Sequence, residues 1–145
     1  MLDVEVFGAE LAPGAPPQRE VRRLCLLAAA AGGVADGHLA IEYVDERRIA
    51  QLNAEHRGKA GPTDVLSFPI DGATPIDGTT AVDAIIKQDD HAERELGDVV
   101  ICPARTSDLR EAIVHGVLHL VGFDHETDSG EMLALQARLL AGEAR

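Results

Sequence analysis

The chain has 145 residues, 46% hydrophobic and 26% charged, which is ordinary for a soluble globular protein. Its formal net charge of −12 argues, on charge alone, against nucleic acid as a partner, because affinity for phosphate depends largely on Lys and Arg. The N-terminal segment MLDVEVFGAE has no basic flank, and the longest apolar stretch, Leu24 to Ala31, is far short of the ~20 residues of a membrane span. We therefore expect a cytoplasmic protein without a signal peptide or a membrane span.

Strand-like and helix-like segments alternate along the chain, which favours an α/β or α+β fold. No internal repeat or domain boundary is visible, so we expect residues 1–145 to form one domain. Alternating apolar and acidic residues predict a half-exposed strand at Leu2–Phe7. A turn rich in Pro, Gly and Ala then leads into a helix from about Gln18 to Ala31, which Gly32-Gly33 stops, and His38–Val44 is the second predicted strand.

The middle of the chain is predicted to add one helix and two strands. Asp45 is a candidate N-cap for a helix that runs to about His56. Thr63–Ile70 is the third predicted strand and Leu96–Cys102 the fourth. Between them, Asp71–Glu95 is polar and acidic with scattered Gly, which indicates a long loop or flexible excursion.

Two helices are predicted in the C-terminal part. Apolar residues recur at helix spacing from near Asp108, and Gly122 supplies the stop. Asp128 and Glu131 have the spacing of a capping box, so the last helix is expected from Met132 to about Leu140.

The segment HGVLHLVGFDH, residues 115–125, contains three of the six histidines. His115 and His119 are four residues apart, so on a helix they project from one face, close enough to share an ion. Gly122 can reverse the chain, so that His125 offers a third nitrogen. Three histidines with an open fourth position are typical of catalytic zinc, so we predict one zinc ion bound by His115, His119 and His125. The alternative is a chance grouping of ordinary surface or core histidines.

The same histidine spacing, H-x3-H-x2-G-x2-H, occurs in metzincin peptidases. Those enzymes use a Glu directly after the first histidine as general base. Here that position is Gly116, which can neither take nor deliver a proton. The predicted ligand arrangement is retained, whereas peptide hydrolysis by that mechanism is disfavoured.

The motif HGVLHLVGFDH resembles the signature of the YbeY family of zinc-dependent endoribonucleases, the bacterial rRNA maturation factors. The blocks LNAEHRGKAGPTDVLSFP (Leu52–Pro69), ELGDVVIC (Glu95–Cys102) and DHETDSGEMLALQARLL also resemble that family, so the likeness covers most of the chain from about Leu39 onward. It implies an α+β fold in which helices flank a mixed four-stranded sheet, with a zincin-like metal helix. It also implies one zinc on the three histidines and cleavage of single-stranded RNA, in maturation of the 3′ end of 16S rRNA and late-stage 70S ribosome quality control.

Arg57 falls on the arginine of the family's second block, which the resemblance implicates in catalysis. A physical reason fits, because phosphodiester cleavage adds negative charge to phosphoryl oxygens and a guanidinium can bind two of them. Without the resemblance, a solvated loop cation is the ordinary interpretation of Arg57. The identity of the proton carrier stays open. Asp124 either supports a metal ligand from the outer coordination shell or is a turn residue. His56 is either a proton carrier or an exposed loop residue.

One departure concerns the fold: only Pro103–Ile113 separates Cys102 from the metal helix, where the family usually has a complete helix. We therefore expect a domain that lacks one helix and exposes part of its sheet.

The leading functional hypothesis is a zinc endoribonuclease that acts on precursor rRNA and has the ribosome or small-subunit proteins as partners. The alternative is a ribosome-associated assembly factor with a mainly structural zinc and little nuclease activity, whose acidic surface docks on basic ribosomal proteins. The resident metal and the oligomeric state stay open at this point.

Overall fold

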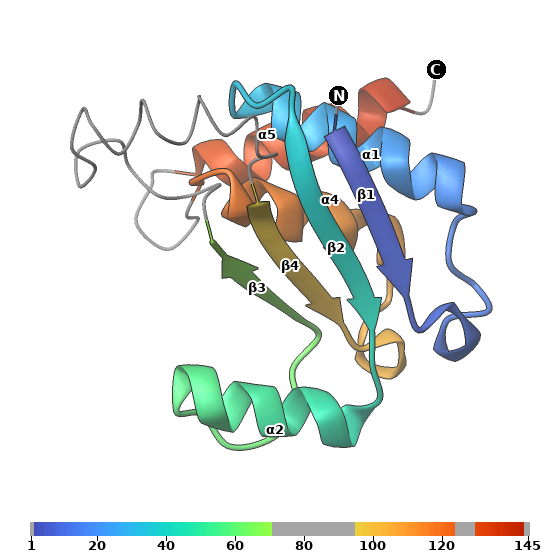
Figure 1. Ribbon diagram of the computed structural model, residues 1–145, viewed down its shortest axis with the longest axis vertical. Coiled ribbons are helices and arrows are strands. Elements are labelled where there is room, and N and C mark those ends of the chain that lie inside the picture. The colour runs from blue at the N-terminus through green and yellow to red at the C-terminus, as the bar shows by residue number, and fades with distance from the viewer. Residues whose placement is uncertain (1, 71–94, 124–129, 144–145) are drawn as a thin grey trace.

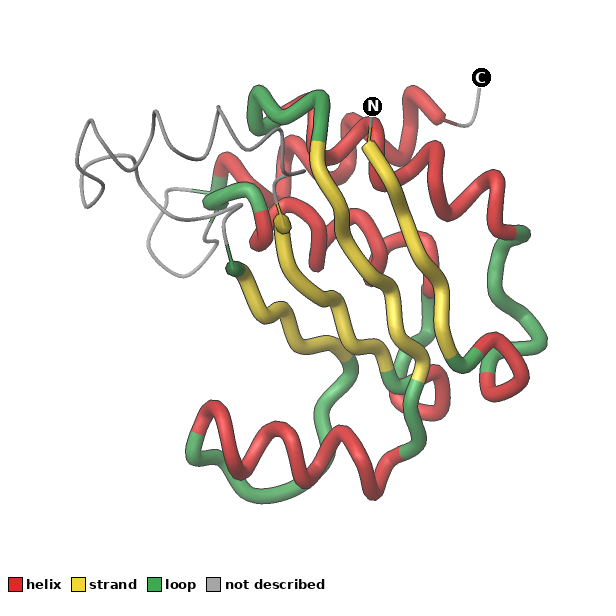
Figure 2. The backbone as a smooth tube through the Cα atoms, in the orientation of Figure 1, coloured by secondary structure: helices red, strands yellow, loops and turns green. Residues whose placement is uncertain are grey.

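The computed structural model describes residues 2–70, 95–123 and 130–143. Four strands in these ranges form one sheet with the order β1-β2-β4-β3. The parallel strands are β1 (Leu2–Phe7), β2 (Gly37–Tyr43) and β4 (Glu95–Ile101), and β3 (Val65–Pro69) is antiparallel to β4 at the edge. Figures 1 and 2 show this mixed sheet in front of three helices.

The main core lies between the sheet and three helices on its far side in Figure 1: α1 (Gln18–Ala31), α4 (Leu109–Leu120) and α5 (Glu131–Glu143). The core is aliphatic, as expected from a chain with three Phe, one Tyr and no Trp. None of the helices in the described ranges is long and apolar enough to cross a membrane.

A second, smaller core holds α2 (Glu46–Arg57) against the other face of the sheet. Its helix side is formed by Ile49 and Leu52, and its strand side includes Leu66 and Val100, which are paired partners in β3 and β4. This packing places the C-terminal end of α2 next to the edge strand.

The predicted α+β fold is confirmed, and the helices and strands lie within a few residues of their expected bounds. The helix expected to end at His56 continues to Arg57, where Gly58 caps it in the left-handed conformation (φ 66°). Glu95, which the sequence predicts to be in a loop, is the first residue of β4, because it pairs with His38 across the sheet. The rest of the predicted loop and the Asp128 capping box lie outside the described residues.

The expected short connection after β4 is present. Along the continuously described stretch 95–123, the chain passes from β4 to α4 through one 3-10 helix, η3 (Pro103–Arg105), with no α-helix between them. The prediction that the first strand is half-exposed is confirmed: the side chains of Asp3, Glu5 and Phe7 on β1 are exposed to solvent.

Candidate active-site groove

Three of the four site residues predicted from the sequence, Arg57, His115 and His119, line one groove of about 830 Å³. His115 and His119 enter it from α4, and Arg57 enters it from the last turn of α2. The edge strand β3 contributes all of its residues to the lining. Segments far apart in the sequence therefore meet along one edge of the sheet.

The two histidines belong to the accessible stripe of a helix that is otherwise largely buried. Glu111, His115 and His119 follow one another at intervals of four, so they share one face of α4, and all three line the groove. The Nε2 atoms of His115 and His119 lie 3.2 Å apart. Their rings are edge to face, with centroids 4.8 Å apart and an interplanar angle of 74°.

This geometry fits a shared zinc ion. Two imidazole nitrogens bound to one tetrahedral zinc at about 2.0–2.1 Å lie roughly 3.3 Å apart. The separation of the two Nε2 atoms is 3.2 Å, and both atoms belong to residues that line the groove. Neutral imidazole nitrogen is also a donor that zinc accepts readily.

His125, the predicted third ligand, and Asp124 lie outside the described residues, so their roles stay predictions. The turn that leads toward them is described. The predicted stop at Gly122 is confirmed: its φ is +105°, and its N–H donates to the carbonyl oxygen of His119 at 3.1 Å. The helix therefore ends at Leu120, directly after the second histidine, and the chain turns at Gly122, as the ligand hypothesis requires.

A buried glutamine on α5 contacts the first histidine, and the sequence analysis did not anticipate it. Oε1 of Gln136 lies 2.8 Å from Nδ1 of His115. Gln136 is only 7% exposed, and Asn53 is the other buried polar side chain among the described residues. No local sequence signal pairs Gln136 with His115, because the contact depends on how α5 docks against α4.

Gly116, where a peptidase of this motif has its base, faces the sheet. A Cβ at this position would lie 2.3 Å from Cγ1 of Val99, so α4 can approach β4 this closely only with glycine here. The carbonyl oxygen of Gly116 accepts a hydrogen bond from Oγ of Ser67 at 3.0 Å. Close packing on β4 therefore explains why this residue is glycine. Through the packing on β4 and the hydrogen bond to β3, it anchors α4 to both strands.

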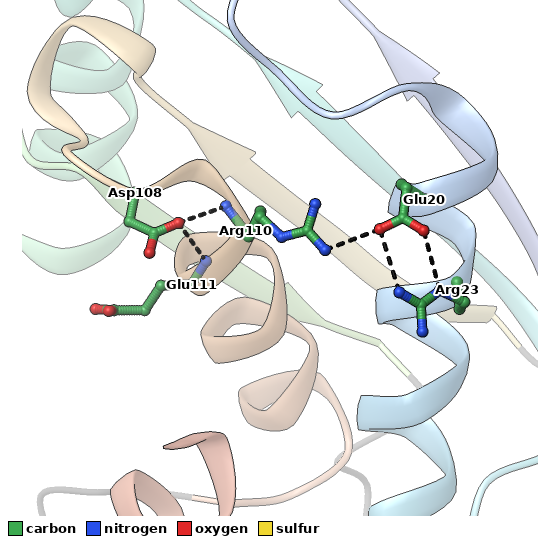
Figure 3. A network of polar contacts seen from close by, with 5 residues as sticks. All are labelled: Glu20, Arg23, Asp108, Arg110 and Glu111. Atoms are coloured by element: carbon green, nitrogen blue, oxygen red, sulfur yellow. Dashed lines mark hydrogen bonds and ion pairs between the residues drawn. The ribbon is translucent and has the colours of Figure 1, made fainter. Parts of the chain in front are cut away.

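A polar network fixes the N-terminal end of α4 (Figure 3). Asp108 caps the helix by accepting from the backbone N–H groups of Arg110 and Glu111. Arg110 reaches across to α1, where its Nη2 lies 2.8 Å from Oε2 of Glu20. The hydrogen bond from Arg23, together with the charges of both arginines, lowers the pKa of Glu20. The carboxylate therefore stays ionised and ties α1 to the histidine helix.

Arg57 is the last residue of α2 and is exposed, rather than part of a loop. No side-chain hydrogen bond or ion pair links it to another residue in the described part of the chain. His56 also belongs to the helix, so the loop interpretation of this residue was wrong. Its ring packs edge to face on Phe68 of β3, with centroids 4.9 Å apart, and both rings line the groove.

A second polar cluster, on the exposed face of the sheet, was not predicted. Ligand-type atoms of Asp3, Glu5 and His38 lie within 4.8 Å of one another. Nε2 of His38 is 2.6 Å from Glu5, and Nδ1 is 2.8 Å from Glu95. These hydrogen bonds, led by the one to Glu95, raise the pKa of His38 above its usual value. A histidine that donates through both nitrogens has no lone pair for a metal, so this cluster is better described as an ion-pair network.

Comparisons with known proteins identify the family of this chain. The model of the family described as endoribonuclease YbeY matches residues 18–142. An endoribonuclease YbeY of Alkalilimnicola ehrlichii is 36% identical, over 97% of this chain and 87% of that protein. Another, from a Nocardioides species, is 41% identical over 71% of this chain and 72% of that protein.

A solved structure is similar in fold. The solution structure of TM1509 from Thermotoga maritima has a TM-score of 0.52 and 21% identity, and covers 97% of this chain and 88% of that one. At this identity the likeness concerns the fold alone.

Proposed function

This chain belongs to the YbeY family of endoribonucleases, and from that premise we propose that it is a zinc-dependent endoribonuclease specific for single strands. Its proposed role is maturation of the 3′ end of 16S rRNA and late-stage 70S ribosome quality control. The observation that supports the activity best is the shared groove of His115, His119 and Arg57. One wall offers nitrogen ligands for a cation, and the other offers a guanidinium for a phosphate.

His115 and His119 would hold the zinc ion, with His125 as the third ligand. A bound zinc ion would supply Lewis acidity toward the phosphate and lower the pKa of an attacking water. Helix α4, which carries both histidines, is fixed in place, because Asp108 caps its first turn and Gly116 lets it lie directly on β4. A rigid ligand pair loses little conformational entropy when it binds a metal.

Arg57 would bind the phosphoryl oxygens on which negative charge develops. Arg57 lines the groove, and no carboxylate among the described residues forms an ion pair with its guanidinium. A planar guanidinium can donate two parallel hydrogen bonds to one phosphate, and it stays charged at any physiological pH. Arg57 also lies at the C-terminal end of α2, where the partial negative charge of the helix dipole favours a cation.

The groove suits an unpaired strand better than a duplex. His56 and Phe68 present aromatic rings beside Arg57, and single-stranded RNA is commonly held by stacking of splayed bases on such rings. The overall charge of −12 disfavours broad contact with a nucleic-acid backbone, so recognition would be local to the groove. The remaining acidic surface would suit contact with basic ribosomal proteins.

The test is cleavage of a single-stranded and a matched duplex RNA by the purified protein, before and after chelation and zinc readdition. We expect cleavage of the single strand only, loss on chelation, and recovery with zinc. His119→Ala and Arg57→Ala should both abolish most activity. Arg47→Ala is the matched control, because Arg47 is an exposed arginine of the same helix that does not line the groove.

Two outcomes would overturn the proposal. Cleavage that survives both chelation and His119→Ala would rule out a zinc-dependent nuclease. Stoichiometric zinc without any RNA cleavage would instead favour the assembly-factor alternative, in which the metal is structural.

A further inference from the structure

We propose that Gln136 is a positioning residue that presents His115 for metal binding, an inference that rests on the proposed zinc-dependent function. The contact that carries it is the 2.8 Å separation between Oε1 of Gln136 and Nδ1 of His115. Gln136 lines the groove from α5, whereas both described histidine ligands come from α4.

The chemistry of this contact fixes the proton on the histidine. An amide oxygen can only accept a hydrogen bond, so Nδ1 of His115 must carry the proton that it donates. A neutral imidazole has one N–H, and Nε2 is therefore left with its lone pair. Nε2 is the atom that lies 3.2 Å from Nε2 of His119. Gln136 thus selects the tautomer in which His115 can donate an electron pair toward its partner.

The packing of α5 holds the amide in place. Met132, one helical turn before Gln136, is fully buried in the main core, so the face of α5 that carries both residues is docked against the rest of the domain. A buried amide is costly unless it is paired, which favours retention of the contact with His115. The orientation of the imidazole is consequently set by a helix other than its own.

A purely structural role for Gln136 makes a different prediction from a positioning role. If the amide only satisfies its own hydrogen-bonding needs, the tautomer of His115 is set elsewhere, and loss of the amide affects folding alone. If the amide positions the ring, its loss changes the tautomer and the metal affinity even in a folded protein. Outer partners of metal-bound histidines typically change metal affinity by about 10- to 100-fold when they are removed.

The experiment compares Gln136→Leu, which has no acceptor, with Gln136→Glu, which keeps one. Leu139→Ala is the matched control, because Leu139 packs on the core from the same helix and does not line the groove. Nitrogen-15 NMR of histidine-labelled, metal-free protein at pH 8 reports which nitrogen of His115 is protonated. Zinc affinity is measured separately, by competition with a chromophoric chelator.

We expect the wild type and Gln136→Glu to be protonated at Nδ1, and Gln136→Leu to gain the Nε2-protonated form. Zinc affinity should fall by about 10- to 100-fold in Gln136→Leu and remain near the wild-type value in Gln136→Glu and Leu139→Ala. Protonation of wild-type His115 at Nε2, or unchanged zinc affinity in folded Gln136→Leu, would overturn the proposal. The tautomer measurement needs neither metal nor RNA, so failure of the nuclease proposal is recognised independently by the cleavage assays.

Discussion

Gly116 and Val99 meet where α4 crosses β4, and a Cβ on the glycine would lie 2.3 Å from Cγ1 of the valine. The helix that carries His115 and His119 therefore lies on the sheet at a distance that only glycine permits. The position that supplies a base in zinc peptidases with this histidine spacing is here part of the contact between helix and sheet. A glutamate at this position would meet Val99 rather than the groove.

Gly116→Ala should destabilise the protein despite the better helix propensity of alanine. Propensity alone favours alanine by about 1 kcal/mol, whereas overpacking against a core side chain costs about 1–3 kcal/mol. We expect overpacking to outweigh propensity, with a net loss of up to about 2 kcal/mol in the free energy of unfolding, measured by urea denaturation. Val99→Ala introduced into the same variant should recover part of this loss. A Gly116→Ala protein as stable as the wild type would show that the close approach is relaxed in solution.

Arg57→Lys should retain only part of the activity, because lysine keeps the charge but cannot form two parallel hydrogen bonds to a phosphate. Removal of one group that stabilises transition-state charge typically lowers kcat by about 10²–10³-fold. We expect Arg57→Ala to lie in that range and Arg57→Lys to lie between it and the wild type. Single-turnover cleavage at saturating RNA measures the chemical step directly. Equal activity of Arg57→Lys and the wild type would indicate that only the charge matters.

The His38 network should make stability depend on pH. The hydrogen bonds to Glu95 and Glu5 raise the pKa of His38 in the folded protein above its usual value. Its contribution is therefore fully present below the unfolded pKa of about 6.5 and is lost as the pH rises through the raised folded value. Because the network is partly exposed, we expect less than about 1 kcal/mol. Urea midpoints of the wild type and His38→Gln should converge as the pH rises, and parallel profiles would contradict this assignment.

Asn53→Ala should weaken the turn that follows Arg57. Nδ2 of Asn53 donates to the carbonyl oxygen of Gly61 at 2.9 Å, and its backbone carbonyl accepts from Gly58 and Lys59. Loss of this part-buried hydrogen bond should cost about 0.5–1.5 kcal/mol, because the carbonyl of the exposed Gly61 can bond to water instead. We also expect a higher KM for RNA, because the C-terminal end of α2 becomes less ordered. Gln51→Ala, a change at an exposed position of the same helix, should leave both quantities unchanged.

Local patterns in the sequence were sufficient to predict most of the helices and strands. Alternation identified β1, and helical periodicity with a glycine stop identified α4 and the facing pair His115 and His119. These features depend on residues close in sequence, whose geometry is fixed by the backbone. The bounds of the elements shifted by a few residues where capping or strand pairing decided them, as at Arg57 and Glu95.

The residues that the sequence analysis missed depend on contacts between distant elements. Gln136 reaches His115 only because α5 docks against α4, and no periodicity reports that docking. His38 and Glu5 meet because β1 and β2 are parallel in a register that the sequence does not specify. The placement of Arg57 beside the histidines followed from the resemblance rather than from spacing, since α2 and α4 meet the groove from opposite faces of the sheet.

The position of β3 at the outer edge of the sheet has a consequence for behaviour at high concentration. An edge strand beside an open groove is a template on which a second chain could add a strand and block the candidate active-site groove. Pro69 has no amide hydrogen, and the first amide of the strand, that of Val65, is already bonded to the side chain of Asp64 at 2.9 Å. At both ends of β3 the outward amide hydrogen is thus either absent or already bonded, so we expect this edge to add a strand of a second copy only poorly.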